Sequence, residues 1–462
     1  MSRTALAAGL LTVALPFAAA PADDPEEQAA AWLEKAERHV EKGQHKRAVD
    51  VYEKIVKKYP ETAAGEVAGR RSLPSAYLGK ADILRSGPSS NRVDVVILGD
   101  GYTLKLMDGY DDIVGDIPRV FERNRVFGEY LSYLNLVRGT TVSEEKGIDS
   151  YGKEYRTVLG GKMSRSIQGQ VTVDREAVRR ILREELPEAD GFAVALVRLG
   201  TLGTGGGGVA AVAAREFNTL IHEWGHAFAN LQDEYSSHTG YRGEAVSSIN
   251  VSSVEDPQRV PWAHFIEARV RGVGVYEGAD GRVRGAWKPT SAGCIMGNGG
   301  FFCPVCREAL VLRLYEFVDP IDAAVPPPSD EPLRLAQDGA PLTFSVQAMR
   351  PKSHTLEVSW WLFPEAEAPP HVSYDAEAAS VGKRRSRGPL PPIEAKPAQR
   401  PRGAKNGVHR FELKPRGLAP GGYVVIVRAV DSTKLRGEKH PWVLKDEAHL
   451  LRSERRWKVI VE

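Results

Sequence analysis

The residues that decide the fold and the chemistry are His222–Tyr235, with the sequence HEWGHAFANLQDEY. His222 and His226 are four positions apart, so on a helix they lie on one face and can bind a single metal ion. Imidazole nitrogen is a common zinc ligand, and a catalytic zinc site has about three protein ligands and one position open to water. The motif therefore predicts a helix at about 217–231 and one Zn²⁺ per chain.

Glu223 is the expected catalytic residue. It follows the first histidine, so its carboxylate can reach a water molecule at the metal, take a proton from it and pass the proton to a leaving amine. The chain has 11 histidines and 60 acidic residues, so a His-Glu-x-x-His match is expected by chance only about 0.03 times. A pair of ordinary surface histidines is therefore the less favoured interpretation.

The third ligand must follow the helix, and the candidates are Asp233 and Glu234. An unbroken helix would carry both residues too far along its axis, so we predict that it ends near Asn230 and that the chain turns back. Extended metallopeptidase motifs place the third ligand ten positions after the first histidine, but Gln232 stands there and is a poor zinc ligand. We favour Asp233 as the metal ligand, with Glu234 supporting it; the reverse assignment stays open.

Strands and helices alternate on the N-terminal side of this motif. Short apolar runs bounded by turn residues are typical of buried strands, and such alternation predicts a mixed α/β domain. Strands are predicted at 93–98, 134–142, 192–199 and 209–213, and helices at about 102–127 and 174–187. Gly205–Gly208 lacks the ending of a phosphate loop and is interpreted as a flexible lead into an edge strand, Val209–Ala213, where an extended substrate would pair.

The pattern changes after residue 320. Residues 321–332 are rich in proline and acidic side chains, which predicts a linker. Several short strands without a helical period then predict a β-sandwich-like domain at 333–462. Within it, residues 364–407 are rich in proline, alanine and basic residues and are predicted to form a mobile loop.

Residues 1–22 have the order of a secretory signal peptide, with Arg3, an apolar run from Ala5 to Phe17 and small residues ending at Ala22. A run of about 13 apolar residues is too short to span a bilayer, which needs about 20. We therefore expect a secreted, periplasmic or cell-envelope protein without stable membrane insertion.

The segment 23–85 is predicted to be helical. Two helices at 26–59, separated by Gly43 and ended by Pro60, have spacings that resemble one tetratricopeptide repeat. A plain helical hairpin is an equally favoured interpretation. In either case we expect this segment to contact a protein partner rather than to carry chemistry.

The composition sets outer limits. A chain of 462 residues suggests two or three domains, and 42% apolar residues can bury real cores. The formal net charge of +2 gives no electrostatic reason to expect a nucleic-acid partner.

Three further motifs accompany the histidine motif: VDVVILGDGYT at 93–103, CIMG at 294–297 and FCPVCRE at 302–308. Together the four motifs resemble the IgA-peptidase family of bacterial zinc metallo-endopeptidases over roughly residues 90–320. CIMG resembles the Met-turn of metzincin-type proteases, in which a methionine lies beneath the metal. The resemblance implies an α/β zincin, metzincin-like catalytic domain at 90–320 that hydrolyses protein or peptide substrates.

The remaining polar motifs are assigned structural roles. The chain has three cysteines, Cys294, Cys303 and Cys306, and we favour a disulfide between two of them over half a zinc site, because a second pair is lacking. Asp100 is expected to stabilise a turn. Tyr235 and Tyr241 are expected to be packed rather than to donate to an oxyanion.

Two functions follow from these patterns. The favoured one is an exported zinc endopeptidase in which Glu223 moves the proton. The alternative is a cell-envelope binding or scaffold protein whose peptidase domain is catalytically silent. The intact Glu223 favours the enzyme.

Overall fold

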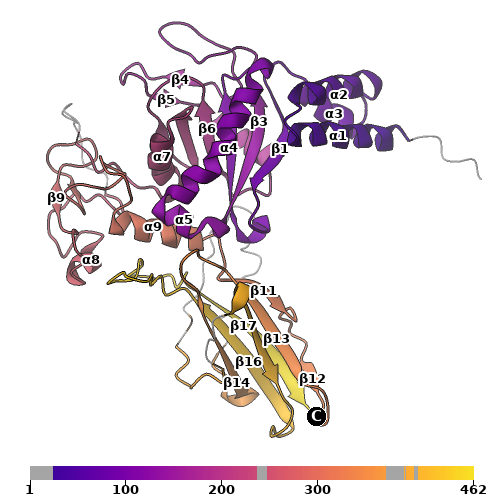
Figure 1. Cartoon of the computed structure of the whole chain (residues 1–462), viewed down its shortest axis with the longest axis vertical. Helices are drawn as coiled ribbons and strands as arrows, with labels where there is room; N and C mark the ends of the chain where they lie inside the picture. The colour runs from indigo at the N-terminus through magenta and orange to yellow at the C-terminus, as the bar shows by residue number, and fades with distance from the viewer. Residues whose placement is uncertain (1–23, 237–246, 371–389, 391, 400–403) are drawn as a thin grey trace, which may run out of the picture.

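A computed structural model describes residues 24–236, 247–370, 390, 392–399 and 404–462. The predicted signal peptide and Tyr241 lie outside this range. Figure 1 shows helices α1–α3 beside a central sheet with its covering helices, and a body of strands at the other end of the molecule. Within the described ranges, none of the helices is both long and apolar enough to cross a membrane.

Six strands form the central sheet, in the order β1-β3-β2-β6-β8-β7. The four inner strands run parallel, and the edge strands β1 and β7 pair antiparallel with their neighbours. The strand bounds are β1 Ala76–Leu84, β2 Val93–Asp100, β3 Leu134–Val142, β6 Phe192–Val197, β7 Thr204–Gly206 and β8 Val209–Ala213. The inner strands confirm the predicted mixed α/β pattern.

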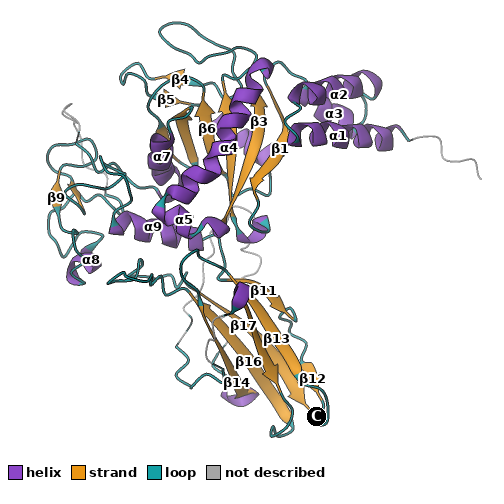
Figure 2. Ribbon diagram, viewed as in Figure 1, coloured by secondary structure: helices purple, strands orange, loops and turns teal. Residues whose placement is uncertain are grey.

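Helices cover both faces of this sheet, α4 and α7 on one face (Figure 2) and α6 on the other. Strand β2 shows how its residues divide, because alternate side chains of a strand point to opposite faces. Val95 and Ile97 join the core with α4 and α7, whereas Val96 and Leu98 join the core with α6. The helices are α4 Met107–Arg123, α6 Arg175–Glu185 and α7 Phe217–Ala229.

Three helices precede the sheet and pack beside β1 (Figure 1). They are α1 Pro25–Glu41, α2 His45–Lys58 and α3 Ala63–Arg71. Asp24 caps α1 by accepting from the backbone N–H of Glu26, and Gly43 turns the chain with a φ of +69°, which glycine adopts at low cost. Tyr52 of α2 donates to the backbone carbonyl of Leu78 in β1 at 2.5 Å, which joins the helices to the sheet.

The prediction of a helical segment at 23–85 is wrong over its last part, because residues 76–84 form β1. Tyr77 and Leu78 are buried in different cores on the two faces of the sheet. A strand of nine residues contains too few apolar positions to be separated from a helix by periodicity alone.

Helix α9, Pro304–Tyr315, leads to seven strands in the described part of the C-terminal region. They form a three-stranded sheet, β11-β13-β15, and a four-stranded sheet, β12-β17-β16-β14. Aromatic rings join the two sheets, with centroids 5.1 Å apart for Phe344 and Trp457 and 5.5 Å apart for Trp360 and Phe411. The strands are β11 Ile321–Val325, β12 Leu333–Leu335, β13 Leu342–Ala348, β14 Glu357–Pro364, β15 Val408–Leu413, β16 Gly421–Val430 and β17 Arg452–Val461.

The predicted linker at 321–332 is wrong in its first residues, because Ile321–Val325 is β11 and pairs with β13. The prolines that follow this short strand dominate the local composition, so the composition alone does not predict the strand. The predicted loop at 364–407 lies largely outside the described residues. Its described part returns to the sheet, where the backbone N–H of Ala398 donates to the carbonyl of Trp360 at 2.8 Å.

The remaining described elements are short. They are η1 Ser89–Asn91, η2 Leu104–Leu106, α5 Arg125–Glu129, η3 Leu131–Tyr133, β4 Lys162–Met163, β5 Val171–Thr172, α8 Ala263–Glu267, β9 Tyr276–Glu277, β10 Trp287–Lys288, η4 Glu365–Glu367 and η6 Lys405–Gly407.

Candidate metal centre

Helix α7 carries the histidine motif and packs closely against the edge strand β7. A Cβ atom at Gly205 would collide with the backbone carbonyl of Glu223 and lie 2.8 Å from the Cβ of His226. Glycine is therefore needed for the close approach of strand and helix. The expectation that Gly205–Gly208 is only a flexible lead is wrong, because Thr204–Gly206 is itself a strand of the sheet.

The helix ends where the sequence predicts. Asn230 adopts the left-handed conformation, with φ of 52° and ψ of 32°, and its backbone N–H bonds back to the last turn of α7. This conformation is a common way for a helix to stop and reverse. The chain then brings Asp233 back to the two histidines.

His222, His226 and Asp233 converge on one point. The Nε2 atoms of the two histidines are 3.1 Å apart. Oδ1 of Asp233 lies 3.1 Å from Nε2 of His222 and 3.2 Å from Nε2 of His226. A tetrahedral zinc ion with bonds of about 2.0–2.1 Å separates its ligand atoms by about 3.3 Å. The three atoms therefore fit three corners of a zinc site.

The hydrogen bonds of the imidazole rings support this assignment. Nδ1 of His222 donates to the carbonyl of Ile295 at 2.7 Å, and Nδ1 of His226 donates to the carbonyl of Leu231 at 2.5 Å. In the neutral rings each Nε2 then carries a lone pair, which is the tautomer that binds a metal. The two Nε2 atoms and the carboxylate Oδ1 of Asp233 face one another, so a positive charge between them, from protons or from a metal ion, stabilises the cluster.

The electrostatics of the cluster also favour a cation. Burial lowers the pKa of His222, but the hydrogen bond to Asp233 and the charge of Glu223 outweigh this effect and raise its pKa to about 9. Burial raises the pKa of Asp233, but its hydrogen bonds with His222 and His226 hold that pKa well below its usual range. The carboxylate is thus ionised at neutral pH, beside the imidazole of His222 with its raised pKa.

Glu223 lies outside the three-atom cluster. It lines the same open cavity as the two histidines and Asp233, and this cavity has a volume of about 800 Å³. Its side chain is buried, and this burial raises the pKa of the carboxyl group, while the charges of His222 and His226 act in the opposite direction. A carboxyl group with a raised pKa beside these candidate metal ligands is a stronger base than an exposed glutamate.

The turn at residues 294–297 lies directly beneath α7. Met296 is fully buried, and a Cβ at Gly225 would lie 2.7 Å from its sulfur. The carbonyl of Met296 accepts from the backbone N–H of Glu234 at 2.6 Å, and that of Ile295 accepts from His222. The turn therefore supports both the helix and the segment that supplies Asp233.

Residues 81–272 match the sequence model of the family described as IgA Peptidase M64. Over this segment the chain is similar to that family. The matched segment begins in β1 and includes the whole of His222–Tyr235, so the residues that converge at the centre lie inside it. The match to the M64 family supports a peptidase, with proteins or peptides as substrates. A comparison with curated proteins gave no match.

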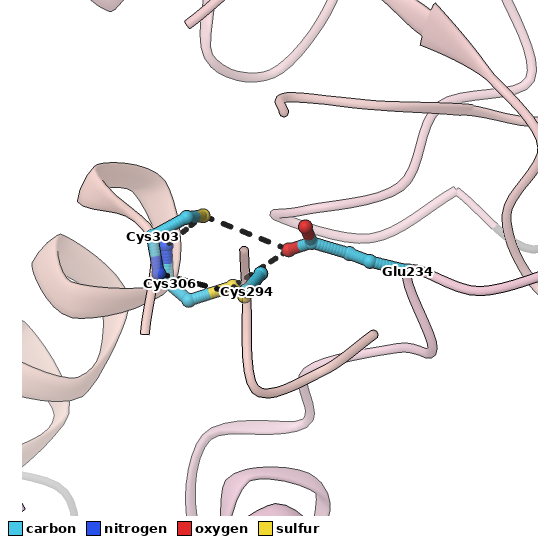
Figure 3. A group of neighbouring side chains, drawn as sticks. All are labelled: Glu234, Cys294, Cys303 and Cys306. Carbon is cyan, nitrogen blue, oxygen red and sulfur yellow. Dashed lines mark hydrogen bonds between the residues drawn. The ribbon is translucent and has the colours of Figure 1, made fainter. Parts of the chain in front are cut away.

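Glu234, the other candidate ligand of this M64 segment, points away from the two histidines. Its Oε1 lies 3.0 Å from Sγ of Cys306 and 3.6 Å from Sγ of Cys303 (Figure 3). The carboxylate of Glu234 therefore contacts the cysteines, and its expected supporting role for Asp233 stays a prediction. Asp233 and Glu234 are thus adjacent in the chain but reach different clusters.

The expected disulfide is wrong. Cys294, Cys303 and Cys306 are all free and buried. Sγ of Cys294 lies 3.8 Å from Sγ of Cys306, whereas a disulfide bond measures about 2.05 Å. The sequence did contain a signal for a metal site in place of a disulfide. A Cys-x-x-Cys pair and a third cysteine supply three ligands, and one carboxylate completes a set of four.

Two further predicted residues have defined places. Asp100 is fully buried and accepts from the backbone N–H groups of Leu159 and Gly161 at 2.8 and 2.7 Å, so it stabilises neighbouring loops. The ring of Tyr235 stacks on His222 with centroids 6.2 Å apart and lines the cavity. Burial and the charge of Asp233 raise the pKa of Tyr235, so its hydroxyl keeps its proton at neutral pH.

Proposed function

We propose that this chain is a member of the M64 family and an exported, zinc-dependent endopeptidase with His222, His226 and Asp233 as metal ligands. The observation that carries the proposal is the convergence of the two Nε2 atoms and one carboxylate oxygen within 3.1–3.2 Å. A bound zinc ion supplies a Lewis acid that polarises the peptide carbonyl and lowers the pKa of a coordinated water.

Glu223 is the general base in this proposal. Its carboxylate takes a proton from the attacking water and later gives a proton to the nitrogen of the leaving amine. Burial keeps the carboxylate in a site of low polarity and raises its pKa, which makes it a stronger base than an exposed glutamate. This intact base favours the enzyme over a catalytically silent scaffold.

The substrate would bind as an extended strand along β7. The earlier choice of Val209–Ala213 is wrong, because β8 pairs with β6 on one side and with β7 on the other. Thr204–Gly206 is the edge of the sheet and lines the same cavity as Glu223 and the two histidines. An exposed strand edge offers backbone groups that can pair with a peptide of many sequences.

The metzincin-like class and the domain roles belong to the same proposal. The packing of Met296 against Gly225, beneath the two histidines, supports a Met-turn. The sequence of residues 1–22 supports export. The helices α1–α3 are the proposed contact surface for a protein partner, and no role in chemistry is assigned to them.

The proposal is tested with an unbiased peptide library and the purified mature protein. Cleavage products are identified by mass spectrometry with active protein, with chelator, and with chelator followed by added zinc. We expect internal cleavage that chelation abolishes and zinc restores. Cleavage that is insensitive to chelation would contradict the metal-dependent mechanism.

A further inference from the structure

A second group of metal-ligand side chains lies apart from the histidine cluster. Glu234, Cys294, Cys303 and Cys306 bring one carboxylate oxygen and three sulfurs together, all within 4.8 Å of one another (Figure 3). Each residue is at most 3% exposed. The match to the M64 family ends at residue 272 and does not include the three cysteines.

Three segments that are separate in the sequence form this cluster. Glu234 follows Asp233, Cys294 begins the turn that contains Met296, and Cys303 and Cys306 stand at the start of α9. Backbone N–H groups point at two of the sulfurs, from Cys303 to Sγ of Cys294 at 3.4 Å and from Cys306 to Sγ of Cys303 at 3.5 Å. N–H donors directed at sulfur stabilise thiolates in metal sites.

The distances fit one tetrahedral ion. With zinc–sulfur bonds of about 2.3 Å and zinc–oxygen bonds of about 2.0–2.2 Å, sulfurs lie about 3.8 Å apart and sulfur lies about 3.5 Å from oxygen. Cys294 and Cys306 are separated by 3.8 Å, and Glu234 Oε1 lies 3.6 Å from Cys303 and 3.0 Å from Cys306. Only small adjustments would bring all four atoms to the corners of one site.

The burial of the Glu234 carboxyl group gives an independent reason for a cation. Its carboxylate is 2% exposed and, apart from the thiols, is contacted by Asn250 Nδ2 at 3.1 Å and Thr290 Oγ1 at 3.4 Å, which are neutral groups. Nζ of Lys288 bonds instead to the backbone carbonyl of Glu234, at 2.5 Å. A buried carboxylate is costly unless a positive charge compensates it.

We propose that Glu234, Cys294, Cys303 and Cys306 form a second metal site that binds one thiophilic divalent cation of the zinc type. Three thiolates select a soft metal, and four protein ligands leave no position for water, so the site is structural. The chain then binds two zinc ions instead of the one that the histidine motif predicts.

The position of the second site suggests what it stabilises. The backbone N–H of Glu234 donates to the carbonyl of Met296, which lies between Cys294 and α9 along the chain. A metal held by Glu234 and the cysteines would fix the Asp233 segment and the Met296 turn to α9. The second metal would therefore position Asp233, without contacting the substrate.

The test is metal analysis of the full-length mature protein after removal of loosely bound ions. Wild-type protein should contain two zinc ions per chain, His222→Ala/His226→Ala one, and Cys303→Ser/Cys306→Ser one. If wild type holds a single zinc that remains in the histidine variant, the second site stands and the proposed catalytic centre fails. If that single zinc is lost in the histidine variant, the second site is refuted.

Cobalt gives a readout that is independent of activity. The His222→Ala/His226→Ala variant loaded with Co²⁺ should show the near-ultraviolet charge-transfer band of thiolate ligands. Glu234→Gln preserves the shape and the three thiols, and should keep that band but bind Co²⁺ at least about tenfold more weakly, since a charged ligand is lost. Absence of the band in the folded histidine variant would overturn the proposal.

Thiol counting tests the competing chemistry. Denatured protein, alkylated without reductant but with chelator, should carry a label on all three cysteines. In the native protein the three thiols should react only after the metal is removed. A disulfide between any two of them would overturn the proposal.

Discussion

At the residue scale, the adjacent residues Asp233 and Glu234 belong to two different clusters of side chains, one with the histidines and one with the cysteines. Oδ1 of Asp233 lies 3.1–3.2 Å from the two Nε2 atoms, whereas Oε1 of Glu234 lies 3.0 Å from Sγ of Cys306. The sequence narrowed the third ligand to these two carboxylates, and the choice of Asp233 agrees with this geometry. The role of Glu234 could not be predicted, because it depends on cysteines that are distant in the sequence.

The first prediction concerns these two carboxylates. Asp233→Asn keeps the size of the side chain but removes the charged ligand, so the variant should contain one zinc fewer per chain and lose cleavage activity. Glu234→Gln should leave the zinc at the histidines in place. Elemental analysis of both purified variants measures the difference. Retention of the histidine zinc in Asp233→Asn, with its loss in Glu234→Gln, would mean that the ligand assignment is reversed.

At the element scale, the packing of β7 on α7 determines the shape of the cavity. The strand contains Gly205, which passes against the backbone of Glu223, and its neighbour Thr204 lines the cavity. A side chain at Gly205 would push the strand away from the helix that carries both histidines. The effect should appear in stability and in catalysis together.

The second prediction is that Gly205→Ala destabilises the protein by about 1–3 kcal/mol, because overpacking forces the backbone to shift. Gly109→Ala is the matched control, since a Cβ there meets nothing within 4 Å on the exposed side of α4. The control should have unchanged or slightly greater stability. Chemical unfolding of both variants measures the difference, and equal stability of the two would contradict the close packing.

Several elements could be predicted because their residues have a clear period or cap. The apolar runs of β2, β3, β6 and β8, and the Asp174 cap before α6, give such signals. Three strands were not predicted. The apolar residues of β1 are divided between the two faces of the sheet, β7 consists largely of glycine, and β11 is followed directly by prolines. Their backbone pairing depends on neighbours that the local sequence does not specify.

At the scale of the whole molecule, a buried ionic network joins the α/β part to the C-terminal sheets. Nδ1 of His354 lies 2.8 Å from Glu129 of α5, and Nε2 lies 2.7 Å from Asp431, which follows β16. Tyr130 and Tyr315 donate to the other oxygen of Asp431, at 3.0 and 2.7 Å. The protonated imidazole bridges the two carboxylates, so its charge stabilises the contact between the two parts.

The third prediction follows from the pKa of His354. Burial lowers this pKa, but the hydrogen bonds to Asp431 and Glu129 outweigh it and raise the pKa from 6.5 to about 9. The stabilisation is complete below pH 6.5 and is lost as the pH rises to about 9, by up to about 3 kcal/mol.

Chemical unfolding across this pH range measures the effect. His354→Gln cannot carry the charge, so the fall in its free energy of unfolding between pH 6.5 and 9 should be smaller than in wild type. Identical pH profiles of the two proteins would show that His354 is not charged in the folded state.

The central claim is that Glu223 moves the proton at a metal held by His222, His226 and Asp233. The most direct measurement compares wild type, Glu223→Gln and Glu216→Gln on one substrate from the peptide library, with zinc content determined for each. Glu216 is exposed at the start of α7 and outside the cavity, so its variant is the matched control. Glu223→Gln should keep its zinc and cleave at least about a hundredfold more slowly, while the control cleaves at the wild-type rate. Equal cleavage by zinc-loaded Glu223→Gln and wild type would contradict the account.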